Sequence, residues 1–314
     1  MLKQVIEVFD ILDRAYVNGQ DVKEIFESHK AKNIKIIELR GDSGKTDFIR
    51  ILIEGTNGKC AGGDSPTLGI TGRLGGLGAR PVKIGFVSDG DGALVALSVA
   101  LKLVDMANVG DRLCGDVVVT THICPNAPTV EHYPVMMMGS PIDISTINKL
   151  EVEDSVDAIL SVDTTKGNKI INHKGFAISC TVKEGYLLRV SDDLLEIMMR
   201  VTGRLPVVFA LTQQDITPYG NGIYHLNSIM QPSTATDVPV VGVAITTETA
   251  VAGCATGATH IMDIESTARF AIEVAKDYTN GKCSFYDAVE FERILKLYGS
   301  MKHFQHKKIE LIEV

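Results

Sequence analysis

Hydrophobic residues change their spacing several times along this chain. In the first thirty residues they recur at helical intervals, as in Val5, Phe9 and Leu12, which predicts two short helices. Strand-like runs follow at residues 34–39 and 48–53, with a Gly-Asp-Ser-Gly sequence between them. Because glycine and aspartate favour tight turns, we expect these two runs to form a β-hairpin.

Beyond residue 81, short apolar runs alternate with longer segments of helical periodicity. The apolar runs predict strands at 82–87, 116–123, 158–162, 175–182, 206–211 and 238–245. The longer segments predict helices at 93–106, 191–200, 264–278 and 286–298. Such alternation is typical of an α/β fold with a mainly parallel, twisted sheet and helices on both faces, a three-layer αβα architecture.

The same pattern suggests how the chain is organised. Residues 82–300 form an α/β core domain, to which the helices and hairpin of residues 1–55 are appended. Residues 56–81 are rich in glycine and are expected to form a long loop, a feature that is often functional in a compact domain. Residues 301–314 are predicted to be a C-terminal tail.

Composition narrows the class of protein. The chain has 314 residues, 45% of them hydrophobic, and a formal net charge of −8. Such an acidic surface argues against nucleic acid or an anionic membrane as the main partner and favours a small molecule or a short peptide. The six cysteines form no Cys-x-x-Cys pair, and neither a leader peptide nor a membrane-spanning run is recognisable. We therefore expect a cytoplasmic protein with reduced thiols.

Polar residues lie at or just after the carboxyl ends of four predicted strands, where open α/β sheets place their ligand sites. They are Asp89 and Asp91, His122 and Cys124, Asp163, and Asp215 and Thr217. Each has a structural alternative. An aspartate before a helix also serves as an N-cap, and Asp163 is also suited to a turn. A histidine or cysteine at a strand end is often simply buried.

Three further side chains are candidates outside these strand ends. His260 precedes the predicted helix at 264–278, as either a ligand or a surface residue. Arg73 and Arg80 flank the glycine-rich stretch, which is suited to an anion-binding nest or to a flexible surface loop. No Gly-x-Ser-x-Gly elbow is present, so a serine nucleophile is not supported.

Taken in order, these segments resemble the catalytic domain of the co-catalytic zinc aminopeptidases and deacylases. Asp89 opens a helix as a metal-binding aspartate does in that group, and Asp163 ends a later strand in the same way. The segments 214–220 and 238–278 resemble the group's later turn, last strand and final helix. Two departures stand out: His122 and Cys124 replace the group's Glu-Glu pair, and its His-x-Asp motif has no counterpart before Asp89.

The resemblance implies a metal-dependent hydrolase of a small amide or peptide. Asp89, His122 and Asp163 would bind one or two divalent ions, zinc or manganese, with His260 completing the shell and Asp91 as the base. The missing glutamate pair leaves two alternatives open. One is a non-catalytic relative that binds a small ligand; the other is a non-hydrolytic enzyme. The ligand-binding residues would then be Arg73, Arg80, Cys124, Asp215 and Thr217.

Two whole segments, 121–128 and 214–222, are similar to the domain-of-unknown-function 1177 family, a likeness that extends over nearly the whole chain. That family implies no activity. Separately, the apolar segment Val-Met-Met-Met at 135–138 lies in a region that is otherwise predicted to be a loop. An apolar segment in such a region is compatible with a contact in a homo-oligomer. The alternative is that this segment packs under its own domain.

Overall fold

The computed structural model describes residues 1–73, 75–78, 85–226 and 228–305. Its main sheet runs in the order β1-β2-β4-β3-β7-β10-β8-β9. The strands are β1 (Asn33–Gly41), β2 (Gly44–Ile53), β3 (Leu68–Gly72), β4 (Val117–Ile123), β7 (Ala158–Thr165), β8 (Gly175–Lys183), β9 (Tyr186–Leu187) and β10 (Val240–Thr246). A separate small sheet pairs β5 (Thr129–Val130) with β6 (Met137–Met138).

The centre of the main sheet is parallel and its two sides are antiparallel. Strands β4, β3, β7 and β10 pair in parallel, whereas β1, β2, β8 and β9 join through antiparallel ladders. Every residue of β3, β4 and β10 is buried, as expected for parallel strands that are covered on both faces. The predicted α/β class is thus confirmed.

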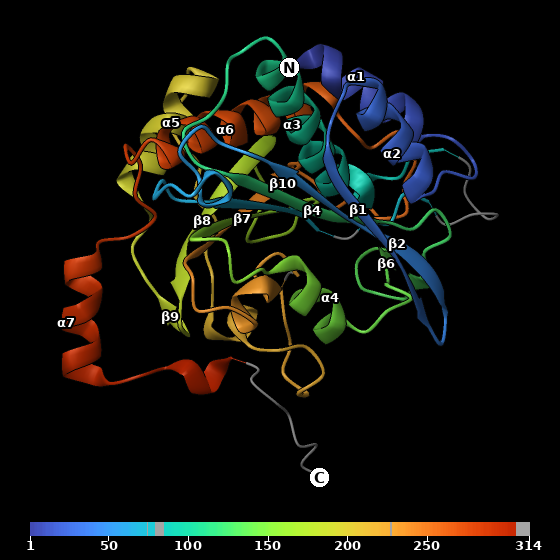
Figure 1. Cartoon of the computed structure of the whole chain (residues 1–314). Coiled ribbons are helices and arrows are strands. Elements are labelled where there is room, and N and C mark those ends of the chain that lie inside the picture. The colour runs from blue at the N-terminus through green and yellow to red at the C-terminus, as the bar shows by residue number, and fades with distance from the viewer. Residues whose placement is uncertain (74, 79–84, 227, 306–314) are drawn as a thin grey trace.

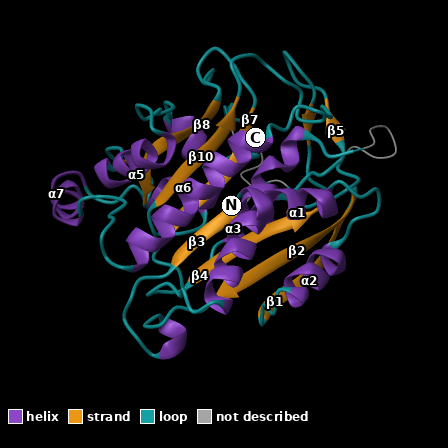
Figure 2. Cartoon of the chain, turned by 90° about the horizontal axis from the view of Figure 1, so that it is seen from above, coloured by secondary structure: helices purple, strands orange, loops and turns teal. Residues whose placement is uncertain are grey.

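Helices lie on both faces of this sheet (Figure 1). On one face lie α1 (Leu2–Leu12), α2 (Gly19–Ser28), α3 (Asp91–Asn108), α5 (Asp192–Thr202) and α6 (Ile261–Thr279). Viewed from above, α1, α3 and α6 lie across the strands (Figure 2). On the other face lies α4 (Ile144–Glu151). The last helix, α7 (Ala288–Tyr298), stands apart from these layers in both views.

Local signals explain the helices that the sequence predicted well. The Ser191 side chain accepts a hydrogen bond from the Leu194 amide and so caps α5, which ends at Gly203 in the left-handed conformation. Helix α6 begins at Ile261, three residues before the start that the sequence predicted. His260 is its N-cap, and Asp263 lies in the first turn.

The glycine-rich segment at 56–81 is not only a loop, because it contributes β3 to the middle of the sheet. Its sequence, Leu-Gly-Ile-Thr-Gly, has too few large apolar residues to show a strand pattern. Glycine is needed here: a Cβ on Gly72 would lie 2.5 Å from the Gly92 carbonyl oxygen. This close approach sets the start of α3 directly against β3.

Two predicted strands are not found as such. Residues 82–84 lie outside the described part of the chain, and Val87 makes only an isolated bridge to Thr256. At 206–211 the structure has an isolated pairing of Val208 with Ile178. The N-terminal hairpin is present, and it extends the main sheet because residues 47–53 of β2 pair with the whole of β4.

Candidate functional site

The carboxyl ends of β3 and β7 bring together residues that are far apart in the sequence. Gly72, the last residue of β3, lies opposite Val162 of β7 in the ladder, so Arg73, directly after β3, comes beside Asp163 within β7. The Arg73 amide donates to the Val162 carbonyl at 2.7 Å. Asp89 enters from the 3-10 turn Ser88–Gly90 that precedes α3. These three candidates therefore share one site.

Asp89 is a buried carboxylate with an unused oxygen. Its side chain lies among Asp163, Asp91 and Lys166, and only 8% of the residue is exposed. Within the described residues, Asp89 Oδ2 has no hydrogen-bond partner. Burial, followed by repulsion from Asp163 and Asp91, raises the pKa of Asp89 well above its usual range, and Lys166 opposes this only in part.

Asp163 is held by two local donors. Its Oδ1 accepts from the Thr164 amide at 2.7 Å, and its Oδ2 accepts from the Ser228 hydroxyl. Burial raises the pKa of Asp163 to about 6, despite the lowering effects of Ser228 and Arg73. Ser228 was not identified from the sequence, because only the folded chain places it beside β7.

Arg73 is fully buried and is paired through one end of its guanidinium. Its Nη1 donates to Asn148 Oδ1 at 2.9 Å and to the Glu151 carboxylate. Both partners come from α4, one turn apart. Burial raises the pKa of Glu151 to about 7, more than Arg73 lowers it. Among the described groups, Arg73 Nε, Arg73 Nη2 and Glu151 Oε1 find no partner.

Asp91 is part of a buried ion pair, which does not suit the role of base that was expected for it. Lys166 Nζ lies 2.6 Å from Asp91 Oδ2, and both side chains are almost completely buried. The hydroxyls of Thr259 and Thr164 also donate to this carboxylate, at 2.6 and 3.3 Å. Burial raises the pKa of Asp91 more than Lys166 and the two hydroxyls lower it. Because these donors already occupy both of its oxygens, Asp91 is poorly placed to accept a proton from a water molecule.

His122 has both ring nitrogens in use. The Gly75 amide donates to Nε2 at 3.2 Å, so Nδ1 carries the proton and donates to Thr46 Oγ1 at 2.8 Å. The Thr46 hydroxyl then donates to the Ile123 carbonyl at 3.0 Å. Burial, with a further contribution from Arg73, lowers the pKa of His122 to about 4. This arrangement matches the structural alternative, a neutral histidine in the core, and leaves no lone pair for a metal.

Replacing His122 with alanine should therefore affect stability. The change leaves the Gly75 amide and the Thr46 hydroxyl without their partner, so we expect the free energy of unfolding to fall by about 1–3 kcal/mol. Urea denaturation at pH 7 measures this loss. Divalent-ion affinity should remain within twofold of wild type, and a complete loss of affinity in a folded variant would contradict this assignment.

The remaining predicted ligand residues lie away from this site or form hydrogen bonds with neighbours in their own turn. His260 is exposed and 3.3 Å from the Asp263 carboxylate, on a cavity of about 740 Å³ beside α5 and α6. Asp215 accepts from the amide and hydroxyl of Thr212, at 2.8 and 2.9 Å, and so caps a short 3-10 turn. The Thr217 hydroxyl donates to the backbone within the same turn. Burial raises the pKa of Cys124 to about 11, and Arg80 lies outside the described residues.

The charges of this site do not balance. Among the residues that the structure describes, it holds four buried carboxyl groups, those of Asp89, Asp91, Glu151 and Asp163, and two buried cations, Arg73 and Lys166. Full ionisation would thus leave a net charge of −2 in a space screened from water. Either two protons or one divalent cation restores neutrality. In the part of the chain that the structure describes, no three His, Cys, Asp or Glu side chains are placed to hold a metal by themselves.

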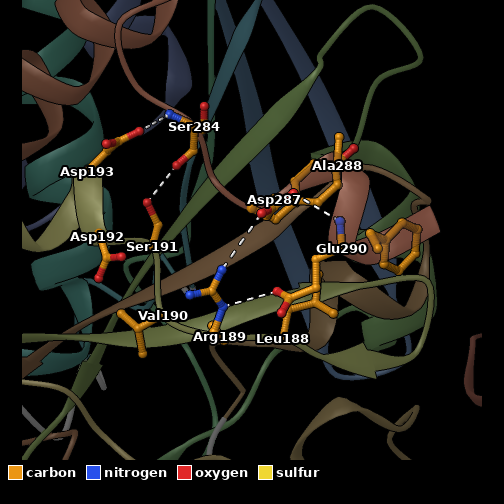
Figure 3. A pocket seen from close by; sticks show the side chains of 12 residues that line it. Leu188, Arg189, Val190, Ser191, Asp192, Asp193, Ser284, Asp287, Ala288 and Glu290 are labelled. Atoms are coloured by element: carbon orange, nitrogen blue, oxygen red, sulfur yellow. Dashed lines mark hydrogen bonds and ion pairs between the residues drawn. The ribbon is translucent and has the colours of Figure 1, made fainter. Parts of the chain in front are cut away.

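Figure 3 shows a different pocket, lined by residues 188–193 and by the start of α7. Arg189 lies 3.0 Å from Glu290 and 3.9 Å from Asp287, and all three side chains are exposed. The Ser191 hydroxyl donates to the Ser284 carbonyl at 2.6 Å. None of the buried charged residues lines this pocket. Its contacts attach α7 to the domain, so we regard it as structural.

The architecture is similar to that of a solved protein structure. The crystal structure of the Legionella pneumophila LapA aminopeptidase is similar, with a TM-score of 0.52 and 10% sequence identity. The match covers 89% of this chain and 71% of that chain, and at such low identity it bears on the fold alone. No curated protein matches the sequence. Within the described residues, no helix is long and apolar enough to cross a membrane.

The sequence itself carries a more specific match. The model of the family described as "Protein of unknown function (DUF1177)" matches residues 37–308, which is most of the chain and includes every residue of the buried charged site. The chain therefore belongs to the DUF1177 family.

Proposed function

We propose that the chain is a hydrolase that uses a divalent cation, bound by Asp89 and Asp163, to cleave an amide bond in a small molecule or short peptide. The observation that carries this proposal is the unbalanced charge of the site, together with the unused Oδ2 of Asp89. A divalent cation between these two carboxylates would remove the repulsion that raises their pKa values. The aminopeptidase-like fold supports the same reading.

The side chains available favour a hard cation. Asp89 and Asp163 offer only oxygen, whereas His122 and Cys124 are engaged in the core. Zinc sites usually have three or four nitrogen, sulfur or oxygen ligands from the protein. Manganese and magnesium accept one or two carboxylates and complete their shells with water or substrate. Manganese is thus the better of the two ions expected from the sequence, with Asp89 and Asp163 retained as ligands.

Each neighbouring residue has a defined part in this proposal. A bound divalent cation would polarise the amide carbonyl and lower the pKa of a water molecule. Glu151, whose pKa of about 7 suits proton transfer at neutral pH, replaces Asp91 as the general base and accepts the proton at its free Oε1. Ser228 orients Asp163, and Lys166 compensates the charge of Asp91.

Metal binding tests the proposal directly. Titration calorimetry with Mn²⁺ should give a one-to-one complex for the wild-type protein and for Asp111→Asn, an exposed control with the same change of charge. The Asp89→Asn and Asp163→Asn variants should lose this binding. They should also be more stable than the metal-free wild type, because each removes a buried repulsion. A folded wild-type protein with no affinity for Mn²⁺, Mg²⁺ or Zn²⁺ at millimolar concentration would overturn the proposal.

Turnover is the second part of this test. A panel of small amides and dipeptides, followed by release of free amine, should show Mn²⁺-dependent hydrolysis that Asp163→Asn abolishes. Binding of the same compounds without hydrolysis would instead support the ligand-binding alternative.

A homo-oligomer is a further part of the proposal. Met136, just before β6, and Met137, in β6, are exposed, whereas Met138 lies in a buried cluster with Val87 and Cys124 of its own chain. Only the first two methionines are thus available for contact with a second copy. Light scattering of the wild type and of Met137→Gln tests this contact.

A further inference from the structure

We infer that Arg73 recognises a carboxylate group of the ligand, so that the site takes N-acyl amino acids or the C-terminal end of short peptides. This inference names the substrate class of the proposed amide hydrolase and so rests on that function. It is carried by the hydrogen bonds that the buried Arg73 side chain makes and lacks, and by the position of this residue directly after β3.

The free edge of Arg73 has the shape of a carboxylate receptor. The guanidinium is completely buried and uses only Nη1, toward Asn148 and Glu151. Nε and Nη2, which present two parallel N–H groups along one edge, lack partners among the described groups. This is the edge through which arginine binds a carboxylate with two hydrogen bonds. Buried donors without acceptors are costly, so a missing acceptor is expected there.

No carboxylate already at the site takes this position. Asp163 is near enough to Arg73 for its pKa to be lowered by the charge, but its two oxygens accept from Thr164 and Ser228. Glu151 contacts Nη1, at the other end of the guanidinium. The acceptor for Nε and Nη2 must therefore come from outside this set, and a ligand carboxylate has both the charge and the geometry that this edge requires.

The position of Arg73 limits how far that carboxylate lies from the bond to be cleaved. Arg73 and Asp163 follow paired residues of neighbouring strands, and such strands are about 4.8 Å apart. A ligand that reaches both must carry its carboxylate within a few atoms of its amide. N-acyl amino acids and dipeptides meet this condition, whereas amides without a carboxylate leave the arginine edge unpaired.

Two ligands of nearly the same size test the inference. N-acetylglycine carries the carboxylate, and N-acetylglycinamide replaces it with a neutral amide. Titration calorimetry with the full-length protein, without divalent ions, should show at least tenfold tighter binding of N-acetylglycine. Because binding is measured without turnover, this result does not depend on catalysis.

Variants then assign the preference to Arg73. The double variant Arg73→Met/Glu151→Met replaces the buried pair with apolar side chains of similar volume, which often preserves stability. It should bind the two ligands equally weakly. Arg73→Lys keeps the charge but loses the paired N–H edge, and its preference should fall below threefold. The matched control Arg50→Met/Glu153→Met removes the ion pair between β2 and Glu153 and should keep the full preference.

The outcomes separate this inference from the proposed hydrolase. If neither compound is hydrolysed but the preference is present and lost in the Arg73 variants, the inference holds for a ligand-binding protein and the hydrolase proposal fails. If amides with and without a carboxylate are bound and hydrolysed equally well, the hydrolase stands and the role of Arg73 is overturned. An undiminished preference in the folded Arg73→Lys and double variants would also overturn it.

Discussion

Replacing Lys166 with methionine is expected to lower the free energy of unfolding by about 3–5 kcal/mol, the usual cost of removing one partner from a buried ion pair. Lys166 Nζ lies 2.6 Å from Asp91 Oδ2, and both side chains are screened from water. Without Lys166, Asp91 would either remain as an uncompensated buried charge or have to bind a proton, and each state costs free energy. Urea denaturation at pH 7 measures the effect.

The double variant Asp91→Asn/Lys166→Met is the control for this prediction. The asparagine keeps an acceptor for the Thr259 hydroxyl and removes the charge. Most of the lost stability should therefore return. If Lys166→Met alone changes the free energy of unfolding by less than 1 kcal/mol, the pair does not make the contribution assigned to it.

Replacing Glu151 with glutamine is expected to change how stability depends on pH. The pKa of Glu151 is about 7 in the folded protein and 4.5 as its ordinary value, so the folded state binds this proton more tightly. The contribution of Glu151 to stability is thus fully present below pH 4.5 and is lost as pH rises toward 7. Relative to Glu151→Gln, wild type should lose about 3 kcal/mol across this window.

Urea denaturation of both proteins at several pH values between 4.5 and 7.5, without divalent ions, measures this difference. Other buried groups titrate in the same window, with His122 acting in the opposite direction, but they are present in both proteins and largely cancel. The exposed residue Glu248 supplies the control substitution, and Glu248→Gln should follow the wild-type curve. Parallel curves for wild type and Glu151→Gln would show that Glu151 titrates normally in the folded state.

The sequence predicted the parts of the molecule that depend on local pattern. Helices α5 and α6 follow from periodicity and from their terminal residues, and the alternation of strands and helices led to the α/β class. Strand β3 was not predicted, because its two glycines interrupt the apolar pattern, and one of them, Gly72, is needed for close packing against α3. Such close packing depends on which element lies next to the strand in the folded chain, so the sequence of the strand itself does not reveal it.

The site was predicted only in part, for a related reason. A position after a buried strand was sufficient to suggest Asp89 and Asp163, and the fold brings them together. Position alone could not show that His122 would be bonded on both sides by Gly75 and Thr46. Glu151 and Asn148 are polar residues on a short helix, a pattern typical of an exposed surface. Only the tertiary structure shows that they face Arg73.

The strand order also determines what the protein exposes at the two edges of its sheet. One edge is β1, which carries the exposed charged residues Lys35, Glu38 and Arg40, and the other is β9, only two residues long. Charged or very short edge strands oppose pairing with a strand from another molecule. The strongly apolar strands β4 and β10 lie inside this protected sheet. The folded protein should consequently resist edge-to-edge aggregation, even at high concentration.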